Sequence, residues 1–276
     1  MSPPAWHLRE RARLSGGVVA HDRLGSGAPL VLVHGTPSWS FLWRRVAPLL
    51  ATDFEVYMFD LLGYGDSENG DGLNVSIAAQ GRLLTELLDV WGLERPAIAG
   101  HDIGGAIMLR ALLVEGRVFE RIALVDSVVF NPWLTPTTMH IRAHLDTYRT
   151  MPVHIYEQVV RAHLRTAVHR TLDEEALAGY MEPWRGAAGQ AAYFNKIAQF
   201  DEADTAELDS LLGQITVPAL IVWGEVDGWI ATSVADRLHR AIEGSRISLI
   251  PAAGHFCMED APEAVAHALG GFFKGA

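Results

Sequence analysis

The sequence is poor in cysteine and in basic residues. Cys257 is the only cysteine among 276 residues, so no disulfide can form within the chain. Lys and Arg number 22 against 33 Asp and Glu, which gives a formal charge of −11. An acidic chain repels phosphate backbones and anionic lipid, so we expect neither a nucleic-acid partner nor a membrane partner.

Long apolar runs are also missing. No run approaches the roughly 18 residues that a membrane-spanning helix needs. The first eleven residues lack the apolar stretch of a secretory signal peptide. With a single cysteine, which is compatible with a reducing compartment, these absences favour a cytoplasmic protein that acts on a small molecule. They leave open whether the chain forms a homodimer.

What the chain does have is a large apolar fraction in short, regularly spaced runs. Apolar residues make up 49% and charged residues 20%, which is typical of a globular protein with a sizeable core. A hairpin is expected over 11–24, with its turn at 15–17. Helical patterns separate the later apolar runs, and this alternation predicts an α/β fold with a mostly parallel sheet. The expected buried strands are 29–33, 55–59, 97–100, 122–125, 219–223 and 247–250, and the expected helices are 41–50, 76–91, 105–114, 233–242 and 262–273.

The alternation lapses between 130 and 212. This stretch has helical patterning, no convincing strand, and many aromatic and histidine residues. We therefore expect a helical lid over 130–212, inserted into a core formed by 1–129 and 213–276.

The segment 99–105 joins an apolar strand to an apolar helix, with Asp102 at the junction. Gly100 and Gly104 flank it and relieve the crowding of a tight turn. A side chain in such a turn points away from the sheet, beside helix N–H groups that stabilise an oxyanion. The sequence has no Gly-x-Ser-x-Gly segment, and Asp102 stands where that serine would be. Asp102 is thus a candidate nucleophile, the alternative being an aspartate that only caps the following helix.

Two later residues have the chain order expected of its partners. His255 follows the last apolar strand in a glycine-containing loop, and Asp227 follows the strand before it. The order nucleophile, acid, histidine is that of a hydrolase triad on an α/β sheet. Glu225 and Asp126 are alternative acids, since each also follows a strand.

Five segments, in order, resemble the epoxide hydrolase and haloalkane dehalogenase branch of the α/β-hydrolases. The resemblance covers nearly the whole chain outside the lid and implies that fold, with Asp102, Asp227 and His255 as a catalytic triad. The five segments are His34–Trp39, Asp60–Ser67, Gly100–Asp102, Trp223–Asp227 and Gly254–His255.

An aspartate nucleophile restricts the chemistry. A carboxylate can open an epoxide or displace a leaving group from saturated carbon, and either reaction gives an alkyl ester with the enzyme. Water activated by His255 would hydrolyse that ester, with Asp227 orienting the imidazole. The backbone N–H groups of Thr36 and Ile103 are the expected oxyanion hole.

The leaving group depends on the lid. Dehalogenases of this branch hold halide with a tryptophan directly after the nucleophile and often an asparagine in the first motif; here those positions hold Ile103 and Thr36. Epoxide hydrolases use lid tyrosines as acids, and Tyr193 lies in a stretch that resembles one of them, with Tyr148 or Tyr156 as the second. Epoxide hydrolysis is therefore the first hypothesis. The expected pocket lies between lid and core and is lined by Thr36, Trp39, Ile103, Trp184, Tyr193 and Tyr156.

Two other hypotheses stay open. The segment 180–184 resembles lid sequence of dehalogenase-like relatives, and Trp39 and Trp184 could donate to a halide, so release of halide from an organohalide is the second hypothesis. A hydrolase-fold protein that binds a ligand without turnover is the third. We expect no cofactor and no metal, because His140 and His144 have helical spacing without the glutamate of a zinc-protease motif.

Overall fold

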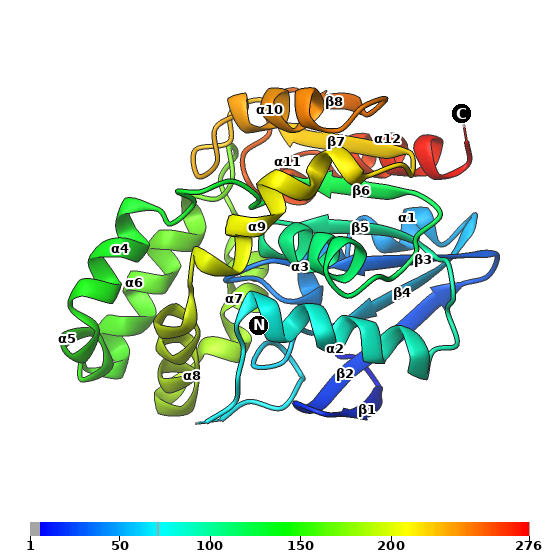
Figure 1. Ribbon diagram of the computed structural model, residues 1–276. Helices are drawn as coiled ribbons and strands as arrows, with labels where there is room; N and C mark the ends of the chain where they lie inside the picture. The colour runs from blue at the N-terminus through cyan, green and yellow to red at the C-terminus, as the bar shows by residue number, and fades with distance from the viewer. Residues whose placement is uncertain (1–5, 71, 276) are drawn as a thin grey trace.

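A computed structural model describes residues 6–70 and 72–275. Its centre is an eight-stranded sheet with the order β1-β2-β4-β3-β5-β6-β7-β8 (Figure 1). The strands are β1 (Glu10–Leu14), β2 (Gly17–Gly25), β3 (Ala28–Val33), β4 (Phe54–Phe59), β5 (Ala97–His101), β6 (Ile122–Val125), β7 (Ala219–Gly224) and β8 (Arg246–Ile250).

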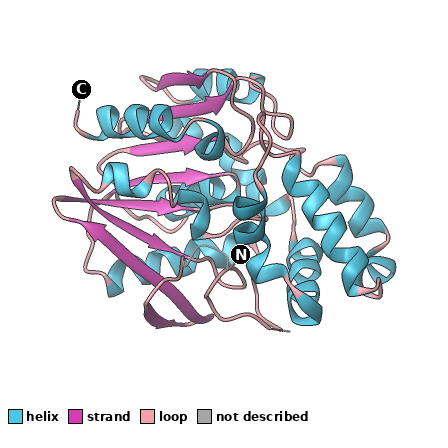
Figure 2. Cartoon of the chain, turned by 180° about the vertical axis from the view of Figure 1, so that it is seen from behind, coloured by secondary structure: helices cyan, strands magenta, loops and turns pink. Residues whose placement is uncertain are grey.

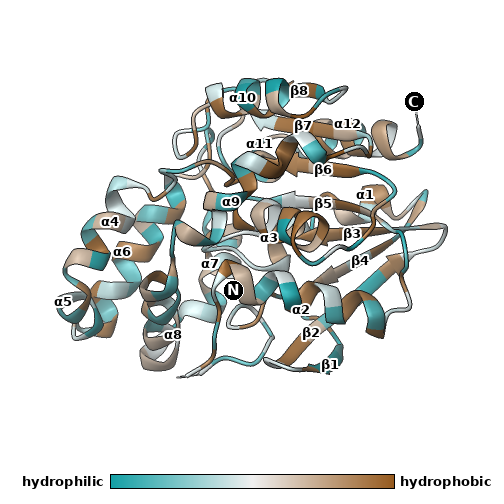
Figure 3. Ribbon diagram, in the orientation of Figure 1, coloured by the Kyte–Doolittle hydropathy of each residue, from teal (hydrophilic) through white to brown (hydrophobic). Residues whose placement is uncertain are grey.

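The sheet is mostly parallel, as predicted. Strands β1 and β2 form the expected hairpin, and β2 also pairs antiparallel with β4. All pairings from β4 through β3 to β8 are parallel. Every residue of β5, β6 and β7 is buried, and Figure 3 shows β3, β6 and β7 as predominantly hydrophobic. Strands buried on both faces need helices on both sides.

Helices cover the two faces of the sheet (Figures 1 and 2). On one side α2 (Ile77–Val90) packs against α3 (Ile103–Leu113), and on the other α1 (Ala47–Leu50) packs against α12 (Pro262–Phe273). The hydroxyl of Ser76 accepts a hydrogen bond from the N–H of Ala79 at 3.2 Å and caps α2, as its position predicts. Two further core helices are α10 (Ser233–Ala241) and α11 (Cys257–Asp260).

The helix expected over 41–50 is wrong as a single element. The chain forms a 3-10 turn, η1 (Ser40–Trp43), and then the short helix α1. Pro48 lies in the first turn of α1, where its missing N–H costs nothing, but a helix continuous from residue 41 would lose a hydrogen bond there.

A helical insertion lies between β6 and β7, beyond the end of the sheet at which β5 leads into α3 (Figure 1). No residue between 130 and 212, all of them described, belongs to a strand. The insertion holds α4 (Pro136–Ala143), α5 (Leu145–Arg149), α6 (Val153–Arg165), α7 (Glu174–Met181), η2 (Glu182–Trp184), α8 (Gly186–Gln199), α9 (Ala203–Leu211) and η3 (Leu212–Gln214).

Among the described residues, no helix is long and apolar enough to cross a membrane. Residues 1–5, part of the segment on which the expectation of no signal peptide depends, lie outside the described residues.

Candidate active site

Asp102 occupies a strained turn between β5 and α3. Its backbone has φ 52° and ψ −124°, a region that residues other than glycine rarely adopt. Close backbone approach explains the neighbouring glycines. A Cβ on Gly104 would lie 2.5 Å from the carbonyl oxygen of His34, and one on Gly100 would lie 2.5 Å from that of Gly104. This turn conformation places the Asp102 side chain at the end of the sheet.

One oxygen of Asp102 lies in the predicted oxyanion hole. The N–H of Thr36 donates to Asp102 Oδ2 at 2.8 Å. Burial raises the pKa of Asp102 to about 6, against the positive charge of His255 and backbone hydrogen bonds from Ile103 and Thr36, which lower it. The group is therefore a carboxylate at neutral pH, with one oxygen held and the other free to react.

The structure brings His255 and Asp227 to this carboxylate. His255 Nδ1 lies 2.9 Å from Asp227 Oδ2, and His255 Nε2 lies 3.8 Å from Asp102 Oδ1. Burial alone would lower the pKa of His255, but the carboxylates of Asp227 and Asp102 raise it to about 9. Nε2 has no hydrogen-bond partner among the described residues, which leaves it open toward the cavity.

Asp126 and Glu225, the alternatives to Asp227 as the acid of the triad, lie in different surroundings. Asp126 also has a positive φ, of 42°, and its Oδ1 accepts from the N–H of Gly224 at 2.8 Å. Burial, and then the negative charge of Asp227, raise the pKa of Asp126 well above its usual value. Glu225 is exposed. Asp227 is thus the carboxylate that bonds to His255.

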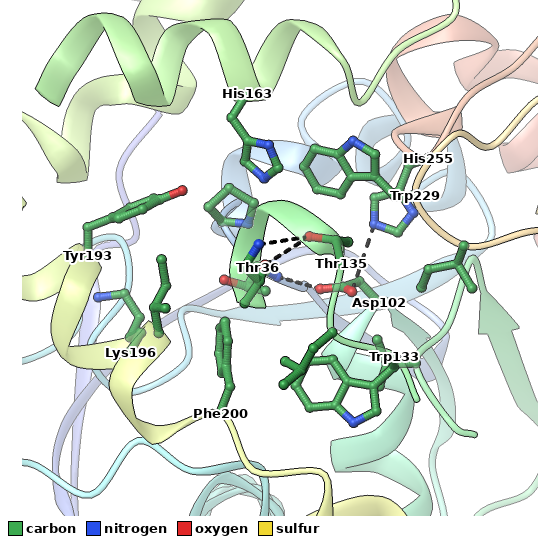
Figure 4. A pocket seen from close by; sticks show the side chains of 16 residues that line it. Thr36, Asp102, Trp133, Thr135, His163, Tyr193, Lys196, Phe200, Trp229 and His255 are labelled. Atoms are coloured by element: carbon green, nitrogen blue, oxygen red, sulfur yellow. Dashed lines mark hydrogen bonds and ion pairs between the residues drawn. The ribbon is translucent and has the colours of Figure 1, made fainter. Parts of the chain in front are cut away.

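Asp102 and His255 open into a cavity between the core and the insertion (Figure 4). The cavity has about 600 Å³ of empty space, part of it open to solvent. Apolar side chains form much of the wall, and a few polar groups face inward. Besides Asp102 and His255, the wall contains Thr36, Pro37, Val128, Trp133, Leu134, Thr135, Thr138, His163, Tyr193, Lys196, Ile197, Phe200, Trp229 and Ile230.

Four residues expected to line the pocket lie behind its wall. The indole N–H of Trp39 donates to the carbonyl of Gly179 at 3.1 Å, and that of Trp184 donates to the carbonyl of Pro37 at 2.8 Å. These bonds turn both indoles into the packing between core and insertion, where both side chains are almost fully buried.

The hydroxyl of Tyr156 likewise donates to a backbone carbonyl, that of Gly189, at 3.3 Å. Ile103 contributes its backbone N–H to the site, while its side chain is buried in the core. Thr36 and Tyr193 do line the cavity, as expected.

Tyr193 is the one tyrosine in the cavity wall. Its hydroxyl has no hydrogen-bond partner in the described part of the chain, and burial raises its pKa. The two tryptophans of the wall differ in this respect. Trp133 donates its indole N–H to Thr205 Oγ1 and Trp229 donates to Thr166 Oγ1, each at 3.0 Å. Among the tyrosine and tryptophan side chains of the wall, the one with a free donor is therefore a phenol, that of Tyr193, rather than an indole.

Most residues of the wall were not predicted, among them His163, Lys196 and Trp229. His163 on α6 is stacked on Trp229, and burial together with the charge of His255 lowers its pKa to about 4, so its ring is neutral. The Lys196 amino group is buried, which lowers its pKa well below the usual value. It donates to the carbonyls of Gly63 and Ala192 and packs over the rings of Tyr64 and Trp184. Among many lid histidines and aromatics, only the abundance was visible in the sequence. Which of them turn inward depends on how the helices pack.

Comparisons with known proteins agree with this fold. A model of the "Alpha/beta hydrolase family" matches residues 30–268. Haloalkane dehalogenase 2 of Mycobacterium tuberculosis is 28% identical over 268 residues, which cover 92% of this chain and 91% of that protein.

Solved structures are similar over almost the whole length. An alpha/beta hydrolase fold protein from Burkholderia ambifaria has a TM-score of 0.93 and 37% identity, covering 97% of this chain and 99% of the other. The epoxide hydrolase CorEH has a TM-score of 0.77 at 22% identity, covering 96% and 98%, which shows a shared fold. Family model, sequence relatives and fold agree: the chain belongs to the alpha/beta hydrolase family.

Proposed function

We propose that this hydrolase opens an epoxide to a diol through an ester between the substrate and Asp102. The observation that carries the proposal is a free phenol, Tyr193, in the same cavity as a carboxylate that is held by the Thr36 N–H and faces His255. An epoxide needs both a nucleophile at carbon and a donor at oxygen.

In the first step, Asp102 Oδ1 attacks an epoxide carbon. The carbon–oxygen bond breaks, its electron pair goes to the epoxide oxygen, and the Tyr193 hydroxyl supplies a proton to that oxygen. The neutral ring of His163 is a second donor to the same oxygen, since its nitrogens have no hydrogen-bond partner among the described residues. The product is a hydroxyalkyl ester of Asp102 with Tyr193 as phenolate.

The charge state of His255 suits this step. With a pKa of about 9, the free enzyme holds an imidazolium at neutral pH. That proton converts the Tyr193 phenolate back to the phenol, because burial raises the pKa of the phenol and disfavours its anion. Once Asp102 is an ester its negative charge is gone, which lowers the pKa of His255 and leaves a neutral base.

In the second step, His255 Nε2 takes a proton from a water molecule, which attacks the carboxyl carbon of the ester. The oxyanion forms on Oδ2, where the Thr36 N–H already donates. The intermediate collapses, the diol leaves with the proton of the added hydroxyl, and Asp102 and the imidazolium are regenerated. Water and epoxide are consumed and one diol is formed.

Dehalogenation is the second candidate, favoured by the 28% identity to a protein named haloalkane dehalogenase 2. The hydrogen bonding of the tryptophan indoles argues against dehalogenation. The N–H groups of Trp39, Trp184, Trp133 and Trp229 are all bonded within the protein. Halide would have to displace one of these bonds or use Tyr193.

Purified enzyme incubated with propylene oxide, styrene oxide and matched 1-bromoalkanes tests the proposal. We expect diol from the epoxides, and Tyr193→Phe should lower that rate by roughly 10²–10⁴. Tyr148→Phe is the matched control, because Tyr148 lies on α5 and does not line the cavity. Bromide release without diol would reverse the order of the two candidates, and binding without either product would refute both.

A further inference from the structure

Three aromatic rings form a row at one end of the cavity: His163, Trp229 and His255 (Figure 4). The rings of His163 and Trp229 lie 4.4 Å apart and nearly parallel, at 9°. Those of Trp229 and His255 lie 4.8 Å apart at 28°. The Trp229 indole is thus held between a lid side chain and the candidate base.

The same indole also borders the outside. A surface groove with about 670 Å³ of empty space shares Thr135, His163 and Trp229 with the cavity wall. Trp229 itself is partly exposed, and Gly228 before it is exposed, with no atom within 4 Å of where its Cβ would be. The groove and the cavity are therefore neighbours separated by these three side chains. The other groove residues are Pro136, Thr137, Thr166 and Gly228.

The backbone around Trp229 is fixed by hydrogen bonds, whereas its side chain is held by ring contacts with His163, His255 and Phe256 and by a single hydrogen bond. Asp227 Oδ1 accepts the N–H groups of Trp229 and Ile230 at 2.7 and 2.9 Å. The side chain has one hydrogen bond, from its indole N–H to the hydroxyl of the exposed Thr166. Rotation of the indole would break this hydrogen bond and the ring contacts, but none of the bonds of Asp227 to the backbone or to His255.

We propose that Trp229 is a gate between the groove and the cavity, and that its bond to Thr166 keeps the gate closed. With the indole in place, the His163–Trp229–His255 row separates the cavity from the groove. With the indole turned away, the groove is continuous with the cavity, and substrates wider than the closed gap can pass. Trp229 and Thr166 thereby set which substrate widths the enzyme accepts. The gate concerns the cavity of the proposed function, yet it does not depend on which leaving group that cavity serves.

We call the hydrogen bond between Trp229 and Thr166 the latch. Substitutions at Thr166 test the latch without changing the reacting groups, because Thr166 lies in the groove and does not line the cavity. Thr166→Val removes the acceptor for the indole at nearly constant size, together with the hydrogen bond that the Thr166 hydroxyl donates to the carbonyl of His163 at 2.7 Å. Thr166→Ser keeps the hydroxyl and is the matched control. A net hydrogen bond shifts an equilibrium about 2- to 12-fold, so the open fraction should rise by that factor in Thr166→Val alone.

The first readout is the rate at which Asp102 is esterified in one turnover by propylene oxide, which is narrow, and by stilbene oxide, which is wide. We expect the ratio of wide to narrow rates to rise about 2- to 12-fold in Thr166→Val and to stay at the wild-type value in Thr166→Ser. Trp229→Ala should raise the ratio further. Esterification with an unchanged ratio in Thr166→Val and Trp229→Ala would overturn the gate.

The second readout needs no turnover. The ¹⁵N indole resonance of Trp229, assigned by its loss in Trp229→Phe, should show increased exchange broadening in Thr166→Val and none in Thr166→Ser. Identical relaxation in the two variants would refute the latch. If no reagent esterifies wild-type Asp102, the proposed function fails, and this resonance alone decides whether the gate exists.

Discussion

Replacing Asp102 by asparagine should make the folded protein more stable at neutral pH. Burial raises the pKa of Asp102 from 3.8 to about 6. The folded state therefore binds this proton more tightly than the unfolded state, and stability falls as the pH rises from 3.8 to 6. Above pH 6 the buried charge of Asp102 destabilises the folded state by its full amount, about 3 kcal/mol, because each unit of pKa shift corresponds to 1.36 kcal/mol. An asparagine side chain at this position would carry no charge and would avoid this cost.

The pH dependence distinguishes this cause from a change in packing. At pH 7.5 we expect Asp102→Asn to raise the free energy of unfolding by about 3 kcal/mol, and at pH 4.5 by only about 1 kcal/mol, because most of the cost disappears once the wild-type carboxyl is protonated. Denaturant titrations of both proteins at the two pH values measure this. An equal difference at both pH values, or a less stable variant at pH 7.5, would refute the reasoning.

Three further outcomes follow from the same site. The rate of Asp102 esterification should fall tenfold per unit below about pH 6 and be constant just above it, since only the carboxylate attacks; a rate that is flat down to pH 4.5 would contradict this. Asp227→Asn should leave esterification measurable but slow ester hydrolysis by roughly 10⁴, so that the ester on Asp102 accumulates; rapid-quench mass spectrometry would detect it, and no accumulation would contradict the role of Asp227. Gly104→Ala should lower the free energy of unfolding by about 1–3 kcal/mol, because its Cβ would lie 2.5 Å from the carbonyl oxygen of His34; a wild-type melting curve would contradict that contact.

The core could be predicted because its signals are local. Buried parallel strands appear as short apolar runs, and the residues that end β5, β7 and β8 must come together at one edge of a parallel sheet. Asp102, Asp227 and His255 follow those strands, and the structure brings them together. Pro48 was a visible signal that the expected helix over 41–50 would break.

The lid could not be predicted to the same depth. Its helices have apolar faces, but a sequence pattern does not say whether an aromatic side chain packs against a neighbouring helix or turns into a cavity. Trp39 and Trp184 donate to backbone carbonyls behind the wall, whereas His163 and Trp229, equally plain in the sequence, face the cavity. For Trp39 and Trp184 the hydrogen-bond partner decides where the indole lies, and that partner is far away in sequence.

The most direct test of the central claim is the fate of oxygen at Asp102. During many turnovers in water enriched in heavy oxygen, hydrolysis of an ester at its carboxyl carbon must leave solvent oxygen on the carboxylate. We predict heavy oxygen in the Asp102 peptide, detected by mass spectrometry, and none there without substrate. Turnover with heavy oxygen in the product but none in that peptide would contradict Asp102 as the nucleophile.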